Sequence, residues 1–134
     1  MDAITTVPAP INEPNLMYAP DSAERMELEQ RLVELQKTQV DLKATIGGQQ
    51  VWGKGEELAV VQPHNHQHVL GVTREASGAD TKAAIKAAAD AAPAWRAMSF
   101  DDRASILLKA AELLSGPWRQ TVNAATMLGQ SKTA

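Results

Sequence analysis

The residues best suited to chemistry are three alternating histidines, His64, His66 and His68. In an extended segment, alternation would place their imidazoles on one face, where they could bind Zn²⁺ or Ni²⁺, which favour nitrogen ligands. No Asp, Glu or Cys is nearby in the sequence to complete or orient such a site. The Pro-x-Asn pattern at 63–65 also favours a turn, which would break the alternation. We therefore favour a surface connection between two strands over a metal site.

Glycine-containing segments offer possible nucleotide sites. The run Gly-Gln-Ser-Lys-Thr at 129–133 ends like a phosphate-binding loop, but Ser131 separates Gly129 from Lys132 and the preceding pattern is helical. Gly47-Gly48 and the pair Gly53 and Gly55 are not followed by the helix that a dinucleotide fingerprint requires. We expect no nucleotide site at these positions, and a new helix start at Ser131 or Thr133.

Paired acids are the remaining candidates for chemistry. Glu56-Glu57 and Asp101-Asp102 occupy an expected hairpin tip and an expected helix start, and neither resembles a general acid/base couple. The sequence has no Cys, which excludes disulfides, thiolate metal sites and a cysteine nucleophile within these residues. We therefore predict no catalytic, cofactor-binding or metal-binding residue in this sequence.

Composition places the chain among soluble globular proteins of one domain. Of its 134 residues, 44% are hydrophobic and 22% charged, and the net charge of −3 gives no general attraction to nucleic acid or anionic membranes. No apolar run approaches the ~20 residues of a membrane-spanning helix. The first basic residue is Arg25, so the start resembles neither a secretory signal nor a mitochondrial presequence. We expect a cytoplasmic protein.

The first half predicts an arm, a helix and a small sheet. Residues 1–20 contain four of the seven prolines and predict an extended arm. Residues 21–39 predict a helix that starts with an Asp21/Glu24 capping box and buries Leu28, Leu32 and Leu35. Short strands are expected on both sides of Gly47-Gly48 within 46–52, and further strands at 58–62 and 69–73. Together these predict a small antiparallel sheet or a pair of hairpins.

The second half predicts three helices. The first spans 80–97 and either kinks or restarts at Pro93. The second is capped near Ser99 and carries an apolar stripe at every third or fourth residue, formed by Ala104, Leu107, Leu108, Ala111 and Leu114.

The turn between the last two helices is expected at Gly116 and Pro117. We expect Gly116 to end the second helix in the left-handed conformation and Pro117 to lie in the first turn of the third. Gly129 should stop the third helix, whose expected buried side is Trp118, Val122, Ala125 and Met127 or Leu128. Two such helices need a third surface, most of which this sequence lacks. The uncovered stripes predict marginal stability or self-association.

The order of these features resembles the N-terminal region of the aldehyde dehydrogenase superfamily. The residues that carry the resemblance are Ile46-Gly47-Gly48, Val51-Trp52, the Ala-rich run at 88–95 and the helix at 103–114. Within that superfamily, four blocks are similar to the Δ1-pyrroline-5-carboxylate dehydrogenases: residues 12–14, 61–66, 109–117 and 125–133. The Leu-Ser-Gly-Pro and Met-Leu-Gly-Gln-Ser-Lys segments are the most specific parts.

The resemblance implies an α/β aldehyde dehydrogenase-like fold. The present portion would be mainly helical with a small antiparallel hairpin region and would lack the Rossmann sheet. Residues 1–20 would form a Pro-rich arm, and 21–134 the N-terminal part of the NAD-binding domain. We read this sequence as a fragment.

Enzymes of this family oxidise L-glutamate 5-semialdehyde to L-glutamate with NAD⁺, through a Cys thiolate and a Glu-assisted water. The resemblance implies a homo-oligomer with a small-molecule substrate and without nucleic acid or membrane partners. No catalytic or NAD-contacting residue of the family maps onto these positions, so this fragment alone should be inactive and should not bind NAD. The alternative is a non-catalytic helical interaction module, which could bind through its Leu-striped first helix. A metal carrier using the histidines ranks third.

Overall fold

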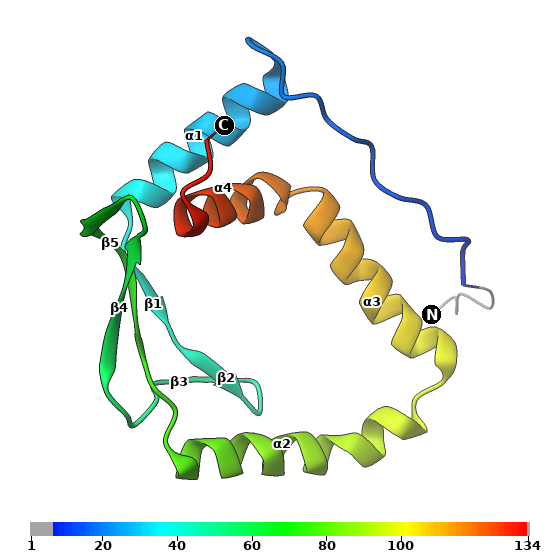
Figure 1. The fold of residues 1–134 in the computed structure, drawn as a ribbon. Helices are drawn as coiled ribbons and strands as arrows, with labels where there is room; N and C mark the ends of the chain where they lie inside the picture. Colours follow the sequence, from blue (N-terminus) through cyan, green and yellow to red (C-terminus); the bar gives the residue numbers. More distant parts are fainter. Residues whose placement is uncertain (1–6, 134) are drawn as a thin grey trace.

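The computed structural model describes residues 7–133, whose helices and strands follow one another around an open frame (Figure 1). The helices are α1 (Ala23–Lys37), α2 (Gly78–Ala97), α3 (Phe100–Ser115) and α4 (Arg119–Gln130). The strands are β1 (Val40–Leu42), β2 (Ala44–Ile46), β3 (Gln49–Val51), β4 (Glu57–Gln62) and β5 (Asn65–Arg74). No helix within the described residues is both long and apolar enough to cross a membrane.

Helix α1 forms where the leucine spacing predicts it, but its cap differs from the expected one. Ser22, rather than Asp21, is the N-cap, and its hydroxyl accepts a hydrogen bond from the Arg25 backbone N–H. Asp21 instead has a positive φ of 63° in the preceding turn. The expected Asp21/Glu24 capping box is therefore wrong: the cap lies one residue later, at Ser22, and the residue three positions on, Arg25, has no acceptor to complete a box.

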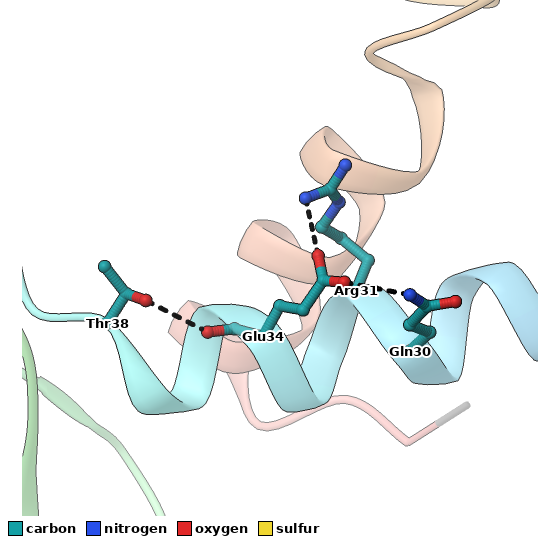
Figure 2. Close-up of polar contacts among 4 residues, drawn as sticks. All are labelled: Gln30, Arg31, Glu34 and Thr38. Atoms are coloured by element: carbon teal, nitrogen blue, oxygen red, sulfur yellow. Dashed lines mark hydrogen bonds and ion pairs between the residues drawn. The ribbon is translucent and has the colours of Figure 1, made fainter.

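Glu34 organises the solvent-facing end of α1 (Figure 2). Its carboxylate accepts hydrogen bonds from Gln30 Nε2 at 3.0 Å and from the Arg31 guanidinium at 2.7 Å. Its backbone carbonyl accepts from the Thr38 hydroxyl at 3.3 Å, just past the end of the helix. Exposed pairs of this spacing each stabilise a helix by only ~0.2–0.5 kcal/mol, so this group supports α1 rather than forming a binding site.

The larger sheet has the order β1-β5-β4 and corrects the expectation of purely antiparallel pairing. Strands β4 and β5 form the expected antiparallel hairpin, whereas β1 pairs with β5 in parallel, with Val40 opposite Gly71. A Cβ at Gly71 would lie 2.5 Å from the Val40 carbonyl oxygen, so only glycine allows this approach. Strand β1 was missed because it has three residues and its partner lies about 30 positions away.

The second sheet is the hairpin expected around Gly47-Gly48. Strands β2 and β3 pair antiparallel, with Ala44 opposite Val51. Gly47 and Gly48 have φ values of 58° and 78°, as a two-residue hairpin turn with two left-handed positions requires. A Cβ placed on Gly47 would lie 3.7 Å from the Cβ of Ala87, so the tip of the hairpin touches α2.

Helix α2 starts beside the expected capping residues Ser77 and Asp80 and continues through Pro93. Ser77 and Asp80 form a complete capping box. Pro93 removes one backbone donor but does not divide the helix, so the expected restart does not occur.

The end of α3 differs from the expected geometry. Ser99 caps α3 as expected and Asp101 and Asp102 lie in its first turn. Gly116 has φ −106° and is not left-handed, and its N–H donates to the Glu112 carbonyl. Pro117 precedes α4 in the tight turn instead of lying in its first turn.

The end of α4 is also displaced from the expected position. The helix runs through Gly129, and the left-handed cap is Ser131, with φ 56°. The Lys132 N–H donates to the Met127 carbonyl, which closes the helix end. Ser131 therefore ends a helix, so the expected new start at Ser131 is wrong; a start at Thr133 would extend beyond the described residues.

The core lies where α1 crosses α4. Leu28, Ala124 and Met127 are its buried residues, and Tyr18, Leu32 and Leu35 pack against them. The predicted packing face of α1 is confirmed. The predicted face of α4 is wrong except for its last positions, because Trp118, Val122 and Ala125 are exposed while Ala124, Met127 and Leu128 are buried.

Candidate functional site

The histidine segment is divided between a turn and a strand. His64 lies in the turn between β4 and β5, and His66 and His68 are part of β5, so the expected connection is shorter than 63–68. The register of β4 against β5 shifts beside Gln62, which breaks the regular alternation. Within residues 7–133 no three His, Cys, Asp or Glu side chains are placed to hold a metal ion.

His64 has a structural contact instead. Its Nδ1 lies 2.8 Å from the Ser131 hydroxyl oxygen, which joins the β4–β5 turn to the C-terminal end of α4 across 67 positions. Nearby, the amide nitrogen of Gln62, a residue only 3% exposed, and Nε2 of His68 are buried without a hydrogen-bond partner among residues 7–133.

The Lys-Thr sequence at 132–133 follows the C-terminal end of α4. A helix C-terminus carries partial negative charge, which disfavours phosphate. Phosphate-binding loops place their lysine at the N-terminal end of a helix, so the geometry here is the opposite.

The glycine pair that was considered as a dinucleotide fingerprint lies against the chain's own backbone. Gly53 and Gly55 pack against the backbone of Glu75, and a Cβ on either would lie 2.3 Å or 2.8 Å from the Glu75 carbonyl oxygen. They allow two chain segments to approach each other and are not open to a pyrophosphate. The N-terminus of α2, the nearest helix start in sequence, is already capped by its own Ser77 and Asp80.

Asp80 is the most strongly bonded carboxylate in this region. Its Oδ2 accepts hydrogen bonds from the Ser77 hydroxyl at 2.7 Å, the Ser77 N–H at 2.8 Å and the Lys54 N–H at 3.0 Å. These bonds, with that of the Ser77 side chain the largest cause, hold the pKa of Asp80 below its ordinary value. The carboxylate thus ties the loop before β4 to the start of α2.

The acidic pairs are structural, and one occupies a different place from that expected. Glu57 starts β4 and pairs with Arg74 of β5 at 3.0 Å, so 56–57 is not a hairpin tip. Arg74 and Lys43 both lie over the Trp52 ring, 5.5 Å and 5.2 Å from its centroid. This stack joins the short hairpin to the larger sheet, with Trp52 and Lys43 half-buried and Arg74 exposed.

The surface best suited to bind another protein element is an apolar groove. A groove of about 320 Å³ lies between the sheet and α4, and we call it the sheet groove. Its lining residues come from α1, β1, β4, β5 and α4, and all are apolar: Leu35, Val40, Leu42, Val60, Leu70, Ala125, Leu128 and Gly129. Without a polar group to orient a substrate, such a surface can bury another apolar element but cannot catalyse a reaction.

The sheet groove was missed in the sequence because α4 was assigned a single apolar face. The helix has two, a buried one that includes Ala124 and Met127 and an exposed one that includes Val122, Ala125 and Gly129. The sequence signal that could have revealed the sheet groove is the presence in α4 of two overlapping sets of apolar residues at helical spacing.

Comparison with known proteins identifies similar chains. A family model described as the aldehyde dehydrogenase family matches residues 51–133. The Δ1-pyrroline-5-carboxylate dehydrogenase of Agaricus bisporus is 39% identical over 127 residues, which is 94% of this chain and 23% of that relative. The mitochondrial Δ1-pyrroline-5-carboxylate dehydrogenase of Homo sapiens is 37% identical over 122 residues, 91% of this chain and 22% of that relative.

Among solved structures, the Δ-pyrroline-5-carboxylate dehydrogenase of Mycobacterium tuberculosis bound with NAD superposes with a TM-score of 0.91 at 51% identity. The match covers 97% of this chain and 24% of that one. The chain therefore spans about a quarter of the length of the proteins it resembles.

Proposed function

Because this chain belongs to the aldehyde dehydrogenase family, we propose that it forms the N-terminal part of an NAD-dependent Δ1-pyrroline-5-carboxylate dehydrogenase. The reaction would oxidise L-glutamate 5-semialdehyde to L-glutamate in proline degradation. The observation that carries this proposal is the match over nearly the whole chain, in sequence and in fold, to the mycobacterial enzyme whose structure contains NAD.

In this proposal the chain contributes structure and other parts of the enzyme contribute chemistry. Residues 1–20 would form an arm, and 21–134 the first part of the NAD-binding domain; of these, 1–6 and 134 lie outside the described residues. The catalytic Cys and Glu, the Rossmann sheet and the NAD site belong to the three quarters of the relatives that this chain does not match. This agrees with the lack of Cys and with glycines that pack against the chain's own backbone. The assembled enzyme is proposed to be a homo-oligomer acting on a small molecule.

The sheet groove has the character that this role requires. An apolar surface open on one side of a small sheet is stable in water only when another element covers it. We propose that the groove receives an apolar element from the rest of the NAD-binding domain. The predicted cytoplasmic location stays a prediction, since the human relative carries the word mitochondrial in its name.

A chimera tests this proposal. The quarter of the mycobacterial enzyme that matches this chain is replaced by this chain, and NADH production from Δ1-pyrroline-5-carboxylate is measured. We expect activity within about tenfold of the parent, because the matched surfaces share the same fold. A folded, NAD-binding chimera without activity would contradict the proposal.

Two matched variants test the groove itself. Val40 lines the sheet groove and Leu58 does not, yet both are 41% exposed. In the chimera, Val40→Asp should lower the yield of active enzyme several-fold, because a charge would be buried without a partner. Leu58→Asp should leave it nearly unchanged. Equal effects would show that the groove is not a contact with the remainder.

The alternative function is a non-catalytic interaction module that binds a partner through α1. In this fold, α1 does not offer the surface that such binding would need. The leucines that would contact a partner, Leu28, Leu32 and Leu35, already pack at the contact with α4.

A further inference from the structure

Helix α4 ends at a residue poorly suited to end a helix, two positions after one that is well suited. Ser131 closes the helix in the left-handed conformation, with φ 56°. A side chain is strained in that conformation, so glycine usually fills this position. Gly129 stands two residues earlier, yet it lies inside the helix, where glycine is a weak helix former. Local preference alone therefore favours an earlier end of α4 than the one observed.

A contact with the larger sheet holds Ser131 in place. Its hydroxyl oxygen lies 2.8 Å from Nδ1 of His64, in the turn between β4 and β5. A hydroxyl group both donates and accepts, so this hydrogen bond forms with either neutral tautomer of the imidazole. The N–H groups of Ser131 and Lys132 both donate to the Met127 carbonyl, which completes the helix end around the same residue. The hydrogen bond to His64 offsets the strain at Ser131, so the sheet helps to determine where α4 ends.

The position of the helix end fixes the direction of the chain that follows. Each residue turns a helix by about 100° and advances it by ~1.5 Å, so an end at Gly129 would start the next segment about 200° away around the axis and ~3 Å earlier. With the observed end, the chain turns towards α1, where Lys132 and Thr133 line a groove of about 350 Å³ together with Leu32 (Figure 1). An end at Gly129 would take the chain away from this course.

We propose that His64 is a positioning residue, which selects Ser131 rather than Gly129 as the end of α4 and so directs the following chain along α1. Its role in the reaction rests on the proposed function, in which the segments that carry the catalytic Cys and the NAD site follow this point of the chain. A misdirected chain would displace those segments, and a displacement of about 1 Å lowers turnover by as much as ~100-fold.

Amide hydrogen exchange in the 134-residue chain tests where α4 ends. His64→Ala should speed exchange of the Ser131 and Lys132 N–H groups about fivefold or more and move the Gln130 Cα chemical shift from its helical value towards the random-coil value. Ser131→Gly supplies a residue that is left-handed without strain, so adding His64→Ala to it should change exchange less than about twofold. His66→Ala is the matched control and should have no effect, because His66 is another exposed histidine of the same segment.

The dehydrogenase chimera tests the positioning role. His64→Ala should lower its kcat about fivefold or more, and Ser131→Gly in the same molecule should restore kcat to within about twofold. A loss that Ser131→Gly does not restore would show that His64 acts only through the packing of its own turn. Unchanged exchange in His64→Ala, an equal effect of His66→Ala, or full activity despite a displaced helix end would also overturn the proposal.

Ser131→Ala removes the same hydrogen bond from its other side and replaces His64→Ala if the latter disturbs the turn between β4 and β5. It should speed exchange as His64→Ala does, and the two changes together should add nothing further. Additive effects would contradict a shared contact. An inactive chimera without these substitutions would contradict the proposed function alone, because the exchange rates of the 134-residue chain still decide where α4 ends.

Discussion

At the scale of single residues, Asp80 shows how one carboxylate fixes two segments. Its hydrogen bonds to Ser77 and Lys54 favour the ionised form and lower its pKa in the folded chain. A depressed pKa contributes stability that is present above the unfolded-state value, near 3.8, and is lost as pH falls through the lower folded-state pKa. Asp80 therefore stabilises the folded chain at neutral and mildly acidic pH, and this stabilisation disappears in strong acid.

The variant Asp80→Asn should be less stable than the parent at neutral pH, and the difference should shrink as the solution is acidified below the pKa of Asp80. Urea unfolding followed at several pH values measures both quantities. Asp90→Asn is the matched control, because Asp90 lies on the same helix and forms an exposed ion pair with Lys86. A stability difference that does not change with pH would show that the amide disturbs α2 by another route.

Tyr18 anchors the arm by its hydroxyl group. That group donates to Gln120 Oε1 and accepts from Asn123 Nδ2, both at 3.1 Å. Tyr18→Phe should cost about 1 kcal/mol of unfolding free energy and make the arm more sensitive to limited proteolysis. Met17→Ala changes a neighbour that is 84% exposed and should do neither. Unchanged cleavage of the arm in the Phe variant would show that apolar contacts alone hold it.

Residues whose partners are close in sequence were the predictable ones. The start of α2 at Ser77 and Asp80 and the cap of α3 near Ser99 follow from side-chain chemistry within three positions. The contact of His64 with Ser131 joins residues 67 positions apart, so no local sequence pattern predicts it. Because such contacts are distant in sequence, the sequence could identify the histidines as candidate ligands but could not predict which residues they contact.

At the scale of elements, the helices and both hairpins were predictable, and the errors lie at their ends. Helices α1 to α4 follow apolar spacing, which acts over a few turns. Gly129 was expected to end α4, but the helix continues to Gln130 because Ser131 takes the left-handed position that glycine usually fills. Strand β1 was not predictable, since three residues carry too little pattern and the pairing depends on Gly71.

Gly71→Ala tests that pairing. The added methyl group would meet the Val40 carbonyl at 2.5 Å, so β1 must move away from β5. We expect a loss of about 1–3 kcal/mol in unfolding free energy and faster hydrogen exchange in β1 and β5. Gly78→Ala is the control, since a Cβ there meets nothing within 4 Å and the change should cost nothing or stabilise by ~0.4–1 kcal/mol. Equal losses at both positions would contradict the close approach.

At the scale of the whole molecule, the elements form but do not close on one another. Buried residues concentrate where α1 meets α4, while α2 and α3 contain none. The sequence indicated this through apolar stripes on more helices than its own elements could cover. It could not show which stripe is covered, because α4 has two apolar faces and only packing decides which of them meets α1.

The open frame has a measurable thermodynamic consequence. An unfolded chain of this length exposes ~20,900 Å², so folding to 10,084 Å² buries roughly three quarters of what a compact fold would bury. The urea m-value scales with that buried area and should be about three quarters of the value for compact proteins of the same length. The measurement is repeated over a range of protein concentrations, so that self-association does not add buried area. An m-value typical of compact proteins, together with no binding of an apolar dye, would mean that α3 folds back onto the rest of the chain in solution.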